Sequence, residues 1–529
     1  MRGADQLIAA IDDAGIDTIF SLSGNQIMPL YDAAIDRDVS IIHTRHEAGA
    51  VYMADGFARA SGKVGVALVT AGPGLTNALG PVFALSKTES PVVLLSGDSP
   101  MALDLMMPFQ RMPQTDIAQA LVKESWRASH AGRIGHDIVG AVRLAQSGRP
   151  GVIHIALPQD VLTGPSESLT LQDDQFKPEP MELANADLPS IMTMLEGAEA
   201  PLIITGPRLH ETRAPGVARA LQEKLSVPVI TMQSPRGLND PSAGQIKKVL
   251  KAADVILLID KDVDFTLASG NAELINADKF GLIAANADSI AHASSVLAGR
   301  LQWGCIGDPI TAVEGLLQSD SYKGPKKWLT TVMKAIAERP KAPAHKPETL
   351  TAHHISSVIK DVMADHNPLY IIDGGEMGQW AQSVLPHEIS LTNGLSGAIG
   401  GAIPQAIGAA LAQPDRHVVA VMGDGSSGFL LSEIETARRL GLNITIVIGN
   451  DRRWGAEVEL QKRNYGDDRL YACMLDDDTR YDKVAEAFGA RGRLVSSEDE
   501  LRNALAESLT GNDPMVINAL MEGMPAPSF

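Results

Sequence analysis

Residues 422–455, MGDGSSGFLLSEIETARRLGLNITIVIGNDRRWG, decide the fold that we predict for this chain. An apolar run over residues 418–422 leads into the turn Gly423-Asp424-Gly425, and a second apolar run over 444–448 leads into Asn450-Asp451. Residues 432–440, which lie between the two runs, have the spacing of a helix that ends at a glycine. The stretch therefore predicts a strand, a glycine-rich turn, a helix and a second parallel strand.

Polar side chains follow both predicted strands. Asp451 comes 27 positions after Asp424, and in open parallel sheets ligands bind outside the carboxyl ends of the strands. Carboxylate or amide oxygens from Asp424 and from Asn450 or Asp451 suit Mg²⁺, which proteins hold with one or two carboxylates plus phosphate oxygens. The backbone N–H groups of residues 425–427 suit a phosphate. Each turn alone is equally typical of a structural turn, but the pair at this spacing indicates a metal and phosphate site.

Length and charge narrow the class of protein. A chain of 529 residues suggests three domains, at roughly 150–200 residues each. The net charge of −19 argues against nucleic acid or an anionic membrane as a partner. Two cysteines fit a reducing compartment, and no leader peptide or apolar run of membrane-spanning length is visible. We therefore expect a cytoplasmic protein.

Strands alternate with helices along three stretches of the chain, which predicts parallel sheets with helices on both faces. The expected fold class is α/β, with three domains at residues 1–170, 188–320 and 350–525. Polar, proline-bearing segments at 172–189 and 319–349 are interpreted as linkers, the second of them around one helix at 328–338. The predicted strands are 18–22, 39–43, 64–70, 92–96, 152–156, 201–205, 227–231, 255–259, 280–284, 369–373, 418–422, 444–448 and 515–520.

The first domain carries a second group of candidate ligand-binding residues. Glu47 starts a predicted helix directly after Arg45-His46. A glutamate at a helix start is usually a surface residue that interacts with the helix dipole. Here it accompanies two glycine-rich turns after strands, Ser23-Gly24-Asn25 and residues 70–77, TAGPGLTN, which let a ligand approach the backbone closely. The combination predicts a cleft with Glu47 in it.

Taken together, these motifs resemble the thiamine-diphosphate enzymes of the acetolactate synthase type. The resemblance runs from Phe20 to about Leu520 and includes RHE at 45–47, TAGPGLTN, Phe109-Gln110, SGRPG at 147–151 and GDG…ND. The branch with 2-hydroxyacyl-CoA lyases and oxalyl-CoA decarboxylase is similarly close. A nucleotide-binding oxidoreductase is disfavoured, because no G-x-G-x-x-G follows the first strand.

The resemblance implies roles for individual residues. Glu47 would hydrogen-bond the aminopyrimidine ring of the cofactor, and Ile399 would support its bent conformation. Asp424 and Asp451, with the backbone oxygen of Arg453, would hold Mg²⁺. The substrate pocket would include Phe109, Gln110 and Trp454. The implied cofactor-binding residues are Gly24, Asn25, Gly72, Pro73, Asn77, Gly375, Glu376, Met377, Gly397, Ile399, Gly423, Gly425, Ser426, Ser427 and Asn450.

Three departures from the family pattern matter. Asp451 stands where the family usually has Asn, so either Asn450 or Asp451 is the second metal ligand. Residues 262–266 read DVDFT where the synthases have an Arg-Phe-Asp-Asp-Arg string that handles the second keto acid. The segment before Ala252 is shorter than in FAD-binding synthases, which argues against bound FAD.

Residues 452–471 show little apolar periodicity, and we hypothesise a mobile loop there.

The resemblance implies ThDP- and Mg²⁺-dependent formation or cleavage of a carbon–carbon bond next to a carbonyl. Decarboxylation of a 2-keto acid, carboligation or both would proceed through an enamine. A 2-hydroxyacyl-CoA lyase or a 2-keto acid decarboxylase is the alternative, and a ThDP-binding protein that acts through association is an alternative of another class. In this family Glu47 and the diphosphate site come from different subunits. A homodimer or a dimer of dimers is therefore expected.

Overall fold

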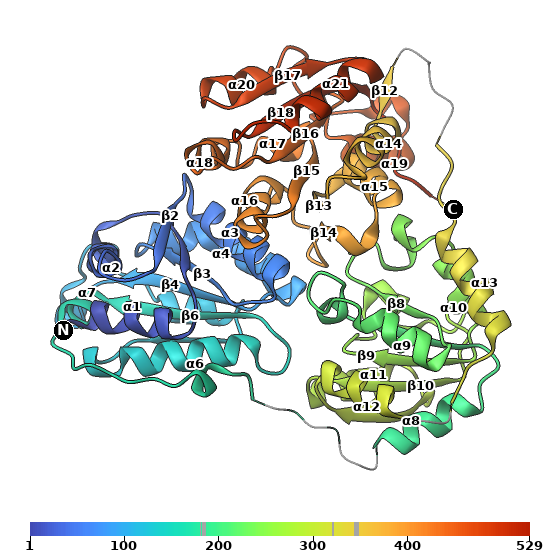
Figure 1. Cartoon of the computed structure of the whole chain (residues 1–529), viewed down its shortest axis with the longest axis horizontal. Coiled ribbons are helices and arrows are strands. Elements are labelled where there is room, and N and C mark those ends of the chain that lie inside the picture. Colours follow the sequence, from blue (N-terminus) through green and yellow to red (C-terminus); the bar gives the residue numbers. More distant parts are fainter. Residues whose placement is uncertain (180, 182, 184–186, 320–321, 343–348, 529) are drawn as a thin grey trace.

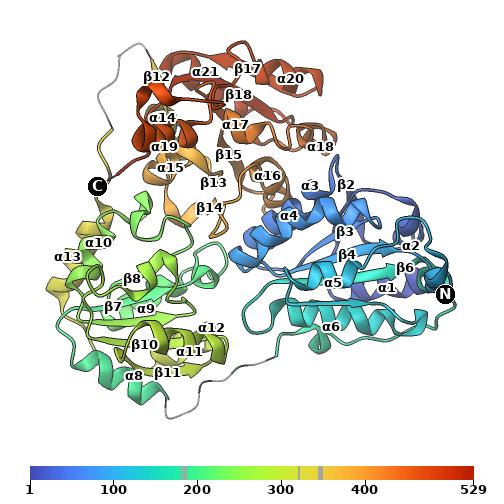
Figure 2. The same ribbon diagram turned by 180° about the vertical axis from the view of Figure 1, so that it is seen from behind.

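The computed structural model describes residues 1–179, 181, 183, 187–319, 322–342 and 349–528. It contains three separate sheets, and every strand pair within them is parallel, which confirms the predicted fold class (Figure 1). Each sheet falls within one of the three predicted units. Figure 2 shows the same three units from behind, with the central unit below the C-terminal one.

The N-terminal sheet has the strand order β2-β1-β3-β4-β6-β5. Its strands are β1 (Thr18–Ser21), β2 (Ser40–His43), β3 (Gly65–Val69), β4 (Val92–Asp98), β5 (Glu124–Arg127) and β6 (Val152–Pro158). Its helices are α1 (Gly3–Asp13), α2 (Met28–Ala34), α3 (Glu47–Ser61), α4 (Pro73–Thr88), α5 (Gln114–Gln119), α6 (Ile134–Gln146) and α7 (Gln159–Thr163). The apolar runs predicted all of these strands except β5, whose residues are polar and half-exposed.

The central sheet has the order β11-β10-β9-β7-β8. Its strands are β7 (Pro201–Thr205), β8 (Val229–Thr231), β9 (Val255–Ile259), β10 (Lys279–Ala284) and β11 (Leu301–Ile306). The helices are α8 (Asp187–Glu196), α9 (Val217–Leu225), α10 (Ile246–Ala252), α11 (Ala287–Val296), α12 (Pro309–Gln318) and α13 (Lys326–Ala337). The sequence pattern did not predict β11, because β11 is an edge strand whose residues alternate between half-buried and exposed.

The C-terminal sheet has the order β12-β18-β16-β15-β13-β14, and β17 also pairs with β18. Its strands are β12 (Leu350–Thr351), β13 (Pro368–Ile372), β14 (Ser390–Thr392), β15 (His417–Gly423), β16 (Thr445–Asn450), β17 (Arg491–Val495) and β18 (Met515–Glu522). The helices are α14 (Ala352–Met363), α15 (Gly375–Val384), α16 (Ala402–Ala412), α17 (Asp424–Ser427), α18 (Glu433–Arg439), α19 (Gly455–Tyr465), α20 (Tyr481–Ala487) and α21 (Glu498–Ser508). β15 and β16 are neighbours, as the opening stretch predicts.

Two segments differ from their predictions. Residues 319–349 were interpreted as a linker, but α13 within them belongs to the central core: Val332 is fully buried there, and the Trp328 indole Nε1 donates a 2.7 Å hydrogen bond to the carbonyl of Pro201. Residues 452–471, hypothesised as a loop, contain helix α19. Helix α19 has few apolar residues, whereas α13 has many, but periodicity does not show which neighbour a helix packs against. Parts of both predicted linkers, at 180, 182, 184–186, 320–321 and 343–348, lie outside the described residues.

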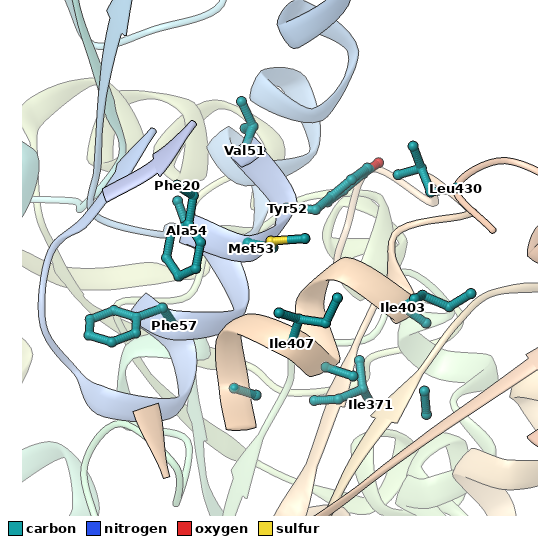
Figure 3. Packing of buried hydrophobic residues seen from close by; sticks show 14 of the residues in the cluster. Phe20, Val51, Tyr52, Met53, Ala54, Phe57, Ile371, Ile403, Ile407 and Leu430 are labelled. Atoms are coloured by element: carbon teal, nitrogen blue, oxygen red, sulfur yellow. The ribbon is translucent and has the colours of Figure 1, made fainter. Parts of the chain in front are cut away.

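Helices α3 and α16 join the N-terminal and C-terminal units. Two glycines allow the backbones to touch: a Cβ on Gly56 would lie 2.1 Å from the carbonyl oxygen of Gln405, and one on Gly408 would lie 2.0 Å from that of Met53. Figure 3 shows side chains of α3 packed against Ile403 and Ile407 of α16 in one shared core. This close crossing fixes the helix that begins with Glu47 against the C-terminal unit.

No helix in the described part of the chain is long and apolar enough to cross a membrane.

Candidate active site

A cavity of about 410 Å³ opens where the C-terminal strands β13, β15 and β16 end. Parallel strands bring their carboxyl ends to one edge of the sheet, where ligands bind in folds of this type. Many of the residues predicted from sequence line this cavity. They are Gly375, Glu376, Met377, Gly397, Ile399, Gly423, Asp424, Gly425, Ser426, Asp451, Arg453 and Trp454.

Asp424 and Asp451 form the acidic floor of the cavity. Asp424 is 3% exposed, and its Oδ2 atom has no hydrogen-bond partner among the described residues. Burial, and next the negative charge of Asp451, raise the pKa of Asp424 to about 7. Asp451 accepts a 2.8 Å charged hydrogen bond from Arg453 Nε. A cation between the two carboxylates would relieve the repulsion and supply the missing partner of Oδ2.

The donor set fits Mg²⁺ together with a phosphate. No group of three or more His, Cys, Asp or Glu side chains is arranged to hold a metal among the residues that the structure describes. Two carboxylates alone match the way in which proteins bind Mg²⁺, where substrate phosphates and water complete the octahedron.

Asn450 and Asp451 are adjacent in sequence but have different surroundings. The Asn450 amide donates to Asn518 Oδ1 at 3.1 Å, and its own Oδ1 accepts from the backbone N–H of Arg452 at 3.2 Å. It is buried and does not belong to the lining of the cavity, whereas Asp451 does. Ser427 likewise lies outside the lining: it is fully buried, and its hydroxyl donates to the Asp424 carbonyl at 2.7 Å. The side chains of Asn450 and Ser427 therefore stabilise the turns through these hydrogen bonds.

Seven glycines line the cavity, so part of its wall is backbone. A Cβ added to Gly375, Gly397 or Gly423 would meet nothing within 4 Å, so these positions leave open space. At Gly425 a Cβ would lie 2.7 Å from the Trp454 ring, so this glycine lets the indole pack onto the turn. The glycines of the lining are 374, 375, 397, 423, 425, 449 and 455.

Glu376, at the start of α15, adds a third carboxyl to the cavity. Its Oε2 atom is buried without a hydrogen-bond partner in the described part of the chain. Burial raises the pKa of Glu376 to about 7; Arg236 and Arg453 oppose this rise, and Glu459 and Asp451 add to it. The carboxyl groups of the cavity therefore outnumber its cations.

Glu47 belongs to a second group of residues, on the N-terminal sheet. It is the first residue of α3 and is 8% exposed. Its Oε2 atom accepts a 3.1 Å hydrogen bond from the Asn77 amide, and Oε1 lies near Gly74. His46 caps the helix by accepting the Ala48 N–H at its Nδ1. The carboxyl is thus held by one partner and keeps a second oxygen for a ligand.

Several other predicted residues of the first unit are linked to one another through the turns after β1 and β3. Gly72, with φ of +60°, lies close to Gln110, and Pro73 starts α4. The Gln110 Oε1 atom accepts a 2.8 Å hydrogen bond from Gln26, which in turn accepts from Thr70. Gly24 packs against Thr70, while Asn25 and Phe109 are exposed, Phe109 to 77%.

The two groups form separate sites within one chain. Of the residues described, none from the N-terminal unit lines the cavity that contains Asp424 and Asp451. The sequence motifs indicate a single active site. Each chain therefore contains two halves of that site, and the two halves do not line one cavity.

Glu433 was not predicted from sequence, yet it connects the units. It is fully buried at the start of α18, and its carboxylate accepts from the backbone N–H groups of Arg45 and His46 at 3.1 and 3.0 Å. A Cβ on Gly49 would lie 2.3 Å from Glu433 Oε1, so the contact requires glycine there. Figures 1 and 2 both place α18 beside β2. Glu433 therefore fixes the chain directly before Glu47.

We expect Glu433→Ala to lower the free energy of unfolding by about 2–4 kcal/mol, because each buried N–H left without an acceptor costs about 1–3 kcal/mol. Glu433→Gln keeps one acceptor oxygen and should lose less. Urea denaturation measures both, with Glu498→Ala on exposed α21 as the control, expected to change stability by less than about 0.5 kcal/mol. An unfolding midpoint of Glu433→Ala equal to that of the control would contradict this role.

Comparison with known proteins agrees with this geometry. Residues 1–120 match the model "Thiamine pyrophosphate enzyme, N-terminal TPP binding domain", and residues 373–519 match the corresponding C-terminal TPP binding domain. The chain therefore belongs to the thiamine pyrophosphate enzymes, as the sequence motifs predicted. Thiamine pyrophosphate, also called thiamine diphosphate (ThDP), is the cofactor of this family, and the protein is a ThDP-dependent enzyme.

Named relatives cover nearly the whole chain. The human protein "2-hydroxyacyl-CoA lyase 2" is 30% identical over 98% of this chain and 90% of its own length. The acetolactate synthase large subunit of Mycobacterium tuberculosis is 29% identical over 98% and 96%, respectively. An acetolactate synthase of Bacillus subtilis is 27% identical over 98% and 92%. The two kinds of relative are thus similarly distant.

Proposed function

We propose that this enzyme uses ThDP and Mg²⁺ to form or cleave a carbon–carbon bond next to a carbonyl, in the manner of the acetolactate synthases. The observation that carries the proposal is the cavity floor: a buried Asp424 oxygen that has no partner among the described residues, beside Asp451, in a cavity whose lining includes seven glycines. Such a floor suits a metal and a diphosphate. Bound ThDP would supply a nucleophilic carbanion, and its thiazolium ring would accept the electrons of the bond broken beside the carbonyl.

Asp424, Asp451 and the Arg453 carbonyl would hold Mg²⁺, and the amides near Gly425 and Ser426 would face the diphosphate. Ile399, which lines the cavity, would support the bend of the cofactor. Glu47 would exchange a proton with the pyrimidine ring through Oε1, since Asn77 occupies Oε2. Asn77 is thereby a positioning residue for the carboxyl.

The proposed active site needs two copies of the chain. Glu47 lies outside the cavity of its own chain, so the cavity of a partner subunit would complete the site. An exposed apolar segment next to Gln110 supports a homodimer or a dimer of dimers: Leu105 is fully exposed, and Met106, Met107 and Phe109 largely so. In the assembled site Phe109 and Gln110 would face the substrate together with Trp454.

We propose that no FAD is bound in the central unit. Nucleotides bind outside the carboxyl ends of parallel strands, and in this chain ion pairs lie there. After β9, Asp262 pairs with Arg149 of the N-terminal unit at 2.5 Å, and after β7, Arg208 pairs with Asp308. These half-buried contacts would have to break for a flavin nucleotide to enter.

Substrate range tests the proposed function. The protein with ThDP and Mg²⁺ is incubated with 2-keto acids and, separately, with 2-hydroxyacyl-CoAs, and the products are identified. Acetolactate-type transfer predicts CO₂ and a carboligation product from 2-keto acids. The similarity to 2-hydroxyacyl-CoA lyase 2 makes an aldehyde and acyl-CoA product the second candidate. An aldehyde and CO₂ alone would indicate a decarboxylase, and tight ThDP binding without any product would indicate a protein that acts through association.

The choice between Asn450 and Asp451 as metal ligand gives a further prediction. Asp451→Ala should weaken Mg²⁺-dependent ThDP binding by roughly 10–100-fold, the range seen when groups that support a metal are lost, while Asp451→Asn keeps an oxygen ligand and should lose less. Asn450→Ala should keep the ThDP affinity and instead lower stability by about 1–3 kcal/mol, because it breaks two buried hydrogen bonds. Titration calorimetry and urea denaturation separate the two effects. The reverse pattern would make Asn450 the ligand.

A further inference from the structure

The central unit contributes a cation to the cofactor cavity. Pro235 and Arg236, in the loop after β8, line the cavity together with the strand ends of the C-terminal unit. Because all the other lining residues come from the C-terminal unit, the loop is where the central unit reaches the proposed active site.

Contacts on both sides hold this loop in place. The Gln233 amide donates to the Ser390 carbonyl at 3.0 Å, and the Ser234 hydroxyl donates to Gln382 Oε1 at 3.2 Å, so two buried side chains anchor the loop to the C-terminal unit. Ser234 Oγ also accepts from the Arg236 backbone N–H at 3.2 Å. The position of Arg236 is therefore set before any ligand binds, which lowers the entropic cost of binding.

A glycine completes the turn. Gly237 has a φ of +51°, and a Cβ there would lie 2.3 Å from the Thr266 carbonyl oxygen. Thr266 belongs to the segment 262–266, which lacks the second arginine of the acetolactate synthase string. The backbone of Thr266 therefore lies against the loop that carries Arg236.

Among the described residues the Arg236 guanidinium has no partner, unlike the other cation of the cavity. Arg453 is paired with Asp451 at 2.8 Å and lies 3.8 Å from Glu459. The described residues provide no side-chain hydrogen bond or ion pair for Arg236, although its positive charge acts to lower the pKa of Glu376. An exposed guanidinium without a partner among the described residues, carried by an anchored loop at the cavity, is suited to bidentate binding of a planar anion such as a carboxylate.

Resting on the proposed function, we propose that Arg236 binds the carboxylate of the acceptor substrate and so selects a 2-keto acid as acceptor. In carboligation the donor 2-keto acid loses its carboxylate as CO₂. The new carbon–carbon bond forms at the acceptor's carbonyl carbon, the carbonyl oxygen takes up a proton, and the acceptor's carboxylate remains in the product. A cation that stabilised the donor's departing carboxylate would oppose its loss. Arg236 is therefore assigned to the acceptor's carboxylate, which remains in the product.

The test compares charged and uncharged acceptors. The wild-type holoenzyme and Arg236→Gln receive one 2-keto acid donor and, as acceptor, either a 2-keto acid or its methyl ester. We expect Arg236→Gln to raise KM for the acid acceptor by roughly 10–100-fold, the loss of one charge-assisted contact of about 1.5–3 kcal/mol, and to leave KM for the ester within about 3-fold. Arg236→Lys should give an intermediate KM for the acid acceptor, because lysine keeps the positive charge but lacks the planar guanidinium that binds a carboxylate through two hydrogen bonds. Arg219→Gln, an exposed position of the central unit, is the matched control.

Two further measurements separate the possible results. Calorimetry of ThDP with Mg²⁺ should give the same affinity for Arg236→Gln and wild type; a weaker affinity of the variant would assign Arg236 to the cofactor's diphosphate and overturn the proposal. Binding of oxamate, an unreactive carboxylate, to the holoenzyme should weaken by about 10-fold in the variant. This binding assay needs no turnover, so it tests Arg236 even if the wild type forms no product and the proposed function fails. Equal oxamate affinity, or equal KM values for the acid acceptor, would overturn the proposal.

Discussion

Glu47→Gln is expected to lower kcat by roughly 10²–10⁴-fold, the range that general acid–base residues contribute, while the affinity for ThDP changes little. The physical reason is that an amide has the shape of the carboxyl but cannot exchange the proton. Oε2 is already used by Asn77, so the loss falls on the one oxygen that remains for the cofactor. Steady-state kinetics and calorimetry of ThDP binding measure the two quantities.

Matched variants make this result specific. Glu124→Gln, an exposed carboxyl on β5 of the same unit, should keep full activity. Asn77→Ala should give a smaller loss than Glu47→Gln, because it frees the carboxyl to rotate without removing it. Turnover of Glu47→Gln equal to that of Glu124→Gln would contradict the role proposed for Glu47, and a parallel loss of ThDP affinity would reassign Glu47 to cofactor binding.

Asp424→Ala is expected to abolish the stabilisation of the protein by ThDP and Mg²⁺. A ligand at 100 times its Kd stabilises the folded state by about 2.7 kcal/mol, and without Asp424 the metal loses one of its two carboxylates. Thermal unfolding with and without ThDP and Mg²⁺ measures the difference. A ligand-induced rise in Tm for Asp424→Ala as large as that of the wild type would refute the metal assignment.

The metal-free protein gives an independent check. The pKa of Asp424 is raised from its ordinary value of 3.8 to about 7, chiefly by burial. The folded state therefore binds more protons than the unfolded state between these values, so this group makes the protein less stable as pH rises from about 4 to about 7. Asp424→Asn should remove that pH dependence in the absence of metal. An unchanged pH profile would show that Asp424 is not the group that titrates.

Strands were predictable where a long apolar run is buried on both faces, whereas the short buried strands β12 and β14 have too few apolar residues to form such a run. The runs around residues 418–422 and 444–448 are apolar on both faces because helices cover both sides of the sheet, and the structure has β15 and β16 there. β5, β11 and β17 lie at edges or are partly exposed, so their residues lack that pattern. Helix α13 shows the converse limit: its sequence predicts a helix, but only packing shows that it covers the central sheet.

The sequence by itself determined the class of this protein. The resemblance to the ThDP enzymes rests on several short motifs in order, among them glycine turns after apolar strands and a glutamate at a helix start, and such motifs are visible in sequence because their residues act locally through backbone shape and charge. Tertiary structure alone decided which side chains meet. Asp451 rather than Asn450 lines the cavity, since neighbouring residues of a strand end face different surroundings. Glu433 and Arg236 reach their places through contacts between units far apart in sequence, which no local pattern records.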